Sequence, residues 1–111
     1  MKILRSLLFI PGNRPDMLAK AVKFNADAIV PDMEDSVPES EKSNARKHIS
    51  NAMKDLIRLG TPVIPRINSL NSGLAEQDIK TALNHRVFGI SVGKISCPDD
   101  IKRLSQIISM V

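Results

Sequence analysis

The sequence has little of several features that define common protein classes. It contains one cysteine, Cys97, so no internal disulfide can form, and such usage is typical of a reducing cytoplasm. No apolar run approaches the roughly 18 residues that a membrane span needs. The apolar run at residues 7–10 is too short for a signal-peptide core and is followed at once by Pro11 and Gly12. We therefore expect a cytoplasmic protein without a membrane segment.

Aromatic residues are equally scarce, since the chain has three Phe and neither Trp nor Tyr. The net charge is only +4, and the basic residues are scattered along the chain. Nucleic-acid surfaces usually combine a clustered basic stripe with aromatic side chains on which bases stack. We therefore do not expect a nucleic-acid partner, whereas a modest positive charge is compatible with a small anionic ligand.

The composition and the patterns that are present are typical of one small globular domain. Of the 111 residues, 42% are hydrophobic and 25% charged, which is the balance of a folded chain rather than a disordered one. Four strand-like stretches are predicted, at residues 3–10, 28–30, 62–67 and 87–92. Each is followed by a helical pattern, and the four helices are predicted to begin at Pro15, after a Ser40 cap, at Leu74 and at Pro98. The second helix should end at Gly60.

Four βα units in succession predict parallel strands joined by right-handed crossovers. Two α/β architectures accommodate this order: a small doubly wound sheet, or the first half of a (β/α)₈ TIM barrel. Length favours the doubly wound sheet, because a complete barrel takes about 250 residues. The placement of polar residues favours the half-barrel, and we adopt it as the prediction for residues 1–111. Polar clusters follow all four strands, at the edge where ligands bind in either architecture: Asn13 and Arg14, residues 32–35, Arg66 and Asn68, and Lys94.

The most informative of these clusters is the segment at residues 32–35, which reads Asp-Met-Glu-Asp. Three carboxylates directly after the apolar stretch 28–30 suit the mouth of a site. There they can bind Mg²⁺ through water, accept hydrogen bonds or take up a proton. The alternative is that they are solvated residues opening a loop before Pro38.

At these residues the chain resembles the citrate lyase β-subunit-like group of the HpcH/HpaI aldolase superfamily. The resemblance rests on five motifs in family order, and together they cover essentially the whole chain. They are the first strand and loop at residues 5–13, the acidic motif at 32–37, the Arg-hydrophobic-Asn motif at 66–68, the helix entry at 72–78, and the segment 89–100.

The resemblance implies a (β/α)₈ barrel that cleaves or forms carbon–carbon bonds in organic acids, often as coenzyme A thioesters, with Mg²⁺. It implies catalytic roles for Arg66, which would hold substrate oxygens, and for Glu34 and Asp35 near the metal. The direct metal ligands of the family would lie beyond Val111. The implied substrate-binding residues are Arg66, Asn68, Phe9, Lys20 and Lys94. For Phe9 a core role, and for Lys20 a solvated helix position, are the alternatives.

Several departures from the family pattern qualify this expectation. Pro31 and Pro65 stand in predicted central strands, where proline removes a backbone donor. Gly93 and Ser96 replace the residues usual around Lys94. With half a barrel, we expect a truncated lyase chain that is inactive alone and self-associates into a homo-oligomer, because its outer strands would lack neighbours. The alternatives are a non-catalytic ligand-binding relic or a small regulatory α/β domain.

Three further residues of reactive type are not expected to be catalytic. His48 and His85 fall on predicted helices and should be surface residues. Cys97, next to Pro98, should be a packed thiol rather than a nucleophile.

Overall fold

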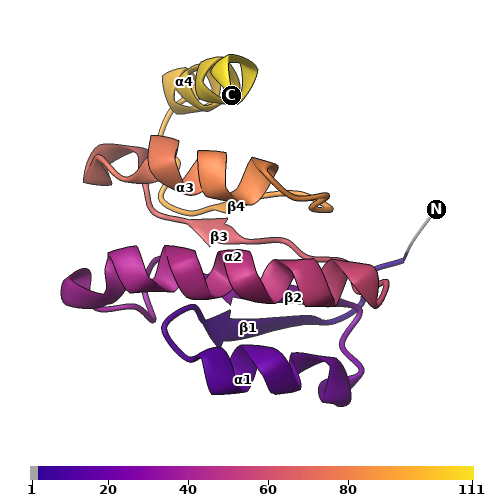
Figure 1. The fold of residues 1–111 in the computed structure, drawn as a ribbon. Helices are drawn as coiled ribbons and strands as arrows, with labels where there is room; N and C mark the ends of the chain where they lie inside the picture. Colours follow the sequence, from indigo (N-terminus) through magenta and orange to yellow (C-terminus); the bar gives the residue numbers. More distant parts are fainter. Residues whose placement is uncertain (1–2) are drawn as a thin grey trace.

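The computed structural model describes residues 3–111, in which four βα units follow one another (Figure 1). The strands are β1 (Leu7–Pro11), β2 (Ala28–Asp32), β3 (Arg66–Ile67) and β4 (Ser91–Val92). The helices are α1 (Pro15–Lys20), α2 (Lys42–Arg58), α3 (Ala75–Leu83) and α4 (Pro98–Met110). Short 3₁₀ turns lie at Ala21–Phe24, Glu39–Glu41 and Leu70–Ser72. No helix in this part of the chain is both long and apolar enough to cross a membrane.

The strands form one parallel sheet in the order β1-β2-β3-β4, and each helix packs against the next in the same order (Figure 1). A doubly wound sheet reverses its strand order at a switch point, whereas a barrel adds each strand beside the previous one. The observed order has no reversal. The prediction of an α/β half-barrel with four parallel strands is confirmed.

The two prolines shorten the sheet, as their missing N–H groups require. The ladder between β2 and β3 has a bridge at Ile29 and Val63 and resumes only at Asp32 and Arg66. Pro31 lies in this interval and cannot donate to the neighbouring strand. Pro65 interrupts the pairing with β4 in the same way, although its carbonyl still accepts from the N–H of Ser91. The predicted strands at 62–67 and 87–92 are therefore reduced to two residues each.

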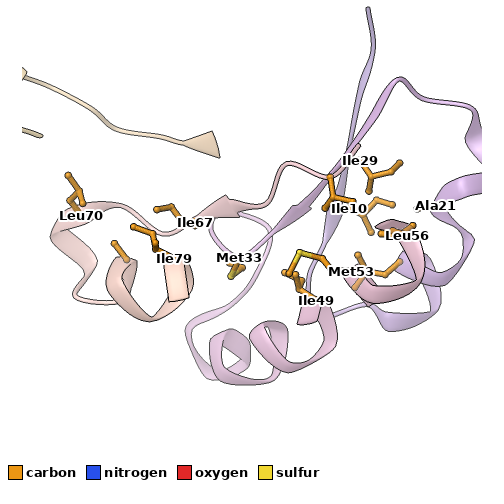
Figure 2. Close-up of a cluster of buried hydrophobic side chains, with 13 residues drawn as sticks. Ile10, Ala21, Ile29, Met33, Ile49, Met53, Leu56, Ile67, Leu70 and Ile79 are labelled. Atoms are coloured by element: carbon orange, nitrogen blue, oxygen red, sulfur yellow. The ribbon is translucent and has the colours of Figure 1, made fainter. Parts of the chain in front are cut away.

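The hydrophobic core lies between the sheet and the helices. The helical periodicity of α2 places three buried residues, Ile49, Met53 and Leu56, against Ile10 of β1 and Ile29 of β2. Figure 2 shows a second group, with Ile67, Leu70 and Ile79, on the β3–α3 side of Met33. The helices thus hold the sheet from one face and fix the ends of the strands where the polar residues lie.

Three local predictions are wrong. Ser40 does not cap α2, because it lies within the preceding 3₁₀ turn and the helix starts after Glu41. His85 lies beyond the end of α3, not on a helix, and its ring nitrogen is 3.1 Å from the hydroxyl of Ser50. Cys97 is exposed rather than packed, since it precedes α4, the last helix of the row, in which no residue is buried. Gly60, by contrast, follows α2 with φ 84°, the left-handed conformation that was predicted.

Gly12 connects the core to the site, and a side chain at this position should destabilise the fold. An added Cβ would lie 2.5 Å from both the carbonyl oxygen of Asp32 and Cδ1 of Ile49. We expect Gly12→Ala to lower the free energy of unfolding by about 1–3 kcal/mol, the usual cost of overpacking. Urea unfolding measures this. Gly89→Ala is the matched control, because its Cβ would meet nothing within 4 Å, and equal effects of the two substitutions would contradict the close packing at Gly12.

Candidate functional site

The register of the parallel strands brings the polar residues together at the carboxyl edge of the sheet. Asp32, the last residue of β2, pairs with Arg66, the first of β3, and Arg66 pairs with Ser91 of β4. Residues aligned in this way point to the same face of the sheet. The sequence clusters that follow separate strands are therefore neighbours in space.

Arg66 and Asp32 form a bidentate ion pair at the centre of this edge. The Nε of Arg66 donates to Oδ1 of Asp32 at 2.7 Å, and Nη2 donates to Oδ2 at 2.6 Å. The side chain of Asp32 is buried, while that of Arg66 is about one-fifth exposed. The ring of Phe9, on β1, lies 5.0 Å from the guanidinium carbon of Arg66, a cation–π distance. Glu34 and Asp35 also lie near the guanidinium, 4.0 Å from Nε and 3.9 Å from Nη1.

Asp32 is ionised in this environment. Burial acts to raise its pKa, but hydrogen bonds from Arg66, from the Ser36 hydroxyl and from the backbone N–H groups of Glu34 and Ser36 outweigh it and hold the pKa well below the usual carboxyl range. Hydrogen bonding to Asp32 in turn raises the pKa of Arg66. The pair is therefore a fixed charge pair across the physiological pH range.

Lys94 reaches the acidic segment from the end of β4. Its Nζ lies 3.1 Å from Oδ1 of Asp35 and 3.4 Å from Oε2 of Glu34. Hydrogen bonds with Asp35 and then Glu34 raise the pKa of Lys94. The backbone of Lys94 has φ 60°, a left-handed conformation that costs energy outside glycine. The structure therefore brings Glu34, Asp35, Arg66 and Lys94 together, as their positions at strand ends predicted.

The acidic loop is also braced from below by a residue that the sequence did not identify. Lys42, the first residue of α2, is buried and donates from Nζ to the carbonyl oxygens of Glu34 at 2.7 Å and Met33 at 3.1 Å. No motif marks this lysine, because its role depends on a helix folding back under the loop. Asp32 belongs to the predicted acidic cluster, but its pairing with Arg66 was not predicted, although its place at the end of a strand was a usable signal.

Asn68 is directed into the fold. Its backbone N–H and side-chain Nδ2 both donate to Oδ2 of Asp78 on α3, at 2.9 and 2.7 Å, and Asn68 is buried. Arg46 of α2 donates to the other oxygen of Asp78 at 2.9 Å. This network ties the end of β3 to α2 and α3, so the geometry gives Asn68 a positioning role rather than a free amide at the mouth.

Lys20 lies on the outer side of β1, away from the acidic loop. With Phe9 it borders a small cavity of about 150 Å³ between β1 and α1, and the remaining lining residues are Leu8, Ile10, Met17 and Phe24. Phe9 is about half exposed, so it is not a core residue. The structure thus places Phe9 beside both Arg66 and Lys20.

The donor set does not fit a metal ion. Among residues 3–111, no three His, Cys, Asp or Glu side chains are grouped closely enough to hold one. The two carboxylates nearest the mouth, Glu34 and Asp35, face Lys94 instead, and Asp32 faces Arg66. We therefore derive no chemical step through a metal from these residues.

Comparison with known proteins identifies relatives along nearly the whole chain. The family model for HpcH/HpaI aldolase/citrate lyase matches residues 5–111. The mitochondrial citramalyl-CoA lyase of Rattus norvegicus is 35% identical over 108 residues, which are 96% of this chain and 32% of that protein. A citrate lyase subunit beta-like protein of Deinococcus radiodurans is 36% identical over 110 residues, which are 96% of this chain and 38% of that protein. The chain thus spans about a third of the length of these curated relatives.

Solved structures show the same fold. The citrate lyase beta subunit of M. tuberculosis, complexed with oxaloacetate and magnesium, superposes with a TM-score of 0.70 at 25% identity, over 89% of this chain and 42% of that one. A CitE structure from the same organism, complexed with magnesium, acetoacetate and coenzyme A, gives a TM-score of 0.75 at 22% identity. It is matched over 95% of this chain and 38% of that one.

The depressed pKa of Asp32 predicts a stability that depends on pH. The ionised carboxylate stabilises the fold above the ordinary carboxyl pKa near 4, and this contribution is lost as pH falls through the lower folded pKa. We expect Asp32→Asn to cost about 2–3 kcal/mol at pH 7, somewhat below the value for a fully buried pair because Arg66 is partly exposed. The difference in the free energy of unfolding between Asp32→Asn and the wild type should become smaller below pH 4.

Urea unfolding at pH 7, 5, 4 and 3 measures this difference. Asp55→Asn, which removes an exposed ion pair with Arg58, is the control. A penalty for Asp32→Asn that stays constant down to pH 3 would contradict the assignment.

Proposed function

Since the chain belongs to the HpcH/HpaI aldolase/citrate lyase family, we propose that it forms the substrate-oxygen-binding part of a carbon–carbon lyase site. The substrate class is a hydroxy acid or its coenzyme A thioester. The observation that carries the proposal is Arg66, a cation fixed by Asp32 at the carboxyl edge of the sheet with its side chain about one-fifth exposed.

The proposed chemistry is retro-aldol or retro-Claisen cleavage. A general base takes the proton of the substrate hydroxyl, and the oxygen forms a carbonyl as the bond between its carbon and the neighbouring carbon breaks. The bonding electrons become the enolate of the second product, which then takes up a proton. A preorganised cation stabilises negative charge most where it develops, at the carboxylate or enolate oxygens. Arg66 supplies that cation, and its guanidinium can donate two parallel hydrogen bonds to a carboxylate. Glu34 and Asp35 are proposed to order the polar groups around it.

The other proposed binding residues lie at three different places. Lys94 adds positive charge beside Arg66 at the mouth. Phe9 and Lys20 border the cavity next to β1 and are proposed for the coenzyme A side, Phe9 by stacking and Lys20 as a cation for phosphate. Asn68 contributes by holding the end of β3 through Asp78.

Magnesium is part of the proposed activity, because relatives with this fold are complexed with it. In the part of the chain that the structure describes, the carboxylates at the mouth are paired with Lys94 and Arg66 and do not form a metal site. We therefore propose that the metal ligands are carboxylates outside this set, and that the 111 residues alone do not turn over. Mg²⁺-dependent cleavage by the purified chain would contradict this proposal.

We also propose that the chain self-associates and that it is cytoplasmic. Both outer strands of the described sheet, β1 and β4, have a free edge, and parallel strands need a neighbour that also covers their apolar faces. A second copy related by a two-fold axis can pair β1 with β4 at both seams. The single cysteine and its exposed thiol agree with a reducing compartment.

Arg66 is the first residue to test. We expect Arg66→Ala to weaken binding of oxaloacetate by about 1.5–3 kcal/mol, the usual worth of a charge-assisted hydrogen bond, measured by calorimetry. Arg66→Lys keeps the charge and Asp32 paired but cannot donate two parallel bonds, so it should lie between the two. Arg58→Ala on α2 is the control, because Arg58 forms only an exposed ion pair with Asp55. Equal affinities of the wild type and Arg66→Ala would remove Arg66 from the site.

The free edge of β1 is the second target. Leu7 is 49% exposed on this strand, and a lysine there should block pairing with another strand. Sedimentation velocity at micromolar concentration should show self-association of the wild type and its reduction in Leu7→Lys. Leu59→Lys is the control, since Leu59 is 64% exposed just beyond α2 and far from the strand edge in sequence. A compact wild-type monomer at these concentrations would contradict self-association.

A further inference from the structure

We infer that Asp32 is a positioning residue for Arg66: it takes the Nε/Nη2 edge of the guanidinium and so fixes the orientation of this cation at the carboxyl edge of the sheet. The inference rests on the proposed function, in which Arg66 holds substrate oxygens. It deepens that proposal by stating which residue fixes the orientation of Arg66.

The guanidinium has two edges that can each donate a pair of parallel hydrogen bonds, and they share Nη2. Asp32 occupies the first edge, with distances of 2.7 Å from Nε and 2.6 Å from Nη2. On the other side, Nη1 has Oδ2 of Asp35 at 3.9 Å, which is too far for a hydrogen bond. The Asp35 carboxylate therefore borders the Nη1 side without a hydrogen bond, and it is the two hydrogen bonds to Asp32 that fix the orientation of the guanidinium.

Asp32 is itself immobilised, so it can act as a clamp. Its Oδ1 accepts from the backbone N–H of Glu34 at 2.8 Å in addition to Nε of Arg66. Its Oδ2 accepts from the N–H and hydroxyl of Ser36, at 3.0 and 2.6 Å, in addition to Nη2. Five donors fill the acceptor capacity of one carboxylate. Asp32 has no lone pair left for a metal or for a proton from substrate, which excludes it as a base and leaves positioning as its role.

Other groups border the guanidinium without a hydrogen bond to it. Phe9 lies against the guanidinium carbon of Arg66, so one face of the group is partly covered. Glu34 and Asp35 lie 4.0 Å from Nε and 3.9 Å from Nη1, and both carboxylates pair with Lys94. Asp32 is therefore the acceptor that holds the guanidinium in place.

The test follows the mobility of the Arg66 side chain by ¹⁵N relaxation and hydrogen exchange of its Nε–H. In the wild type we expect a rigid, slowly exchanging Nε–H. In Asp32→Asn exchange should be at least tenfold faster, and the order parameter should fall. Asp27→Asn is the matched control, because Asp27 precedes the same strand and accepts N–H bonds from Arg5 and Ser6 at its opposite end. An Nε–H as protected in Asp32→Asn as in the wild type overturns the inference.

Ser36→Ala keeps the experiment decisive if Asp32→Asn does not fold. It retains the ion pair and removes one donor to Oδ2 of Asp32, so a smaller but measurable rise in Nε–H exchange is expected, and no change counts against the clamp. A second arm titrates oxaloacetate into the wild type and Asp32→Asn. We expect the guanidinium resonances of Arg66 in the wild type to shift and the affinity to fall at least tenfold in the variant. If oxaloacetate does not bind the wild type, the proposed function fails, while the exchange measurement still decides whether Asp32 positions Arg66.

Discussion

The ion pair between Asp32 and Arg66 is the interaction on which the site depends, because it joins the last residue of β2 to the first residue of β3. It lies where the ladder between these strands resumes after the interval that contains Pro31. It also fixes the cation around which the other charged residues gather. Glu34 and Asp35 follow Asp32 in the same loop, and Lys42 holds that loop from below. Lys94 then crosses from β4 to the acidic pair, so three strands contribute to one charged cluster.

The fold was predictable from the sequence because periodicity reports burial. The alternation of apolar stretches and helical faces gave four βα units, and the strand order without reversal distinguishes a barrel segment from a doubly wound sheet. The exact strand lengths were not predictable from apolar composition, since Pro31 and Pro65 remove donors from a ladder whose register only the folded chain defines. Ser40 failed as a cap for a related reason: a polar residue before a helix does not say whether a 3₁₀ turn intervenes.

The location of the site was predictable from the sequence, but the roles of its residues were predictable only in part. Strand-end placement correctly brought Glu34, Asp35, Arg66 and Lys94 together. It could not show that Asn68 turns inward to Asp78, because that contact depends on where α3 packs. It could not show the function of Lys42 either, since its target is backbone carbonyl rather than a motif residue. The first carboxylate of the acidic segment binds the arginine, whereas the next two pair with Lys94.

The central claim is that Asp32 and Arg66 act as one unit, and a double-mutant cycle tests it most directly. The free energy of unfolding is measured at pH 7 for the wild type, Asp32→Asn, Arg66→Gln and the double variant. If the two groups stabilise each other as the geometry indicates, the sum of the two single losses of free energy should exceed the loss in the double variant. The difference, which is the coupling energy, should be about 1.5–3 kcal/mol. Losses that add, with a coupling energy near zero, would contradict the account.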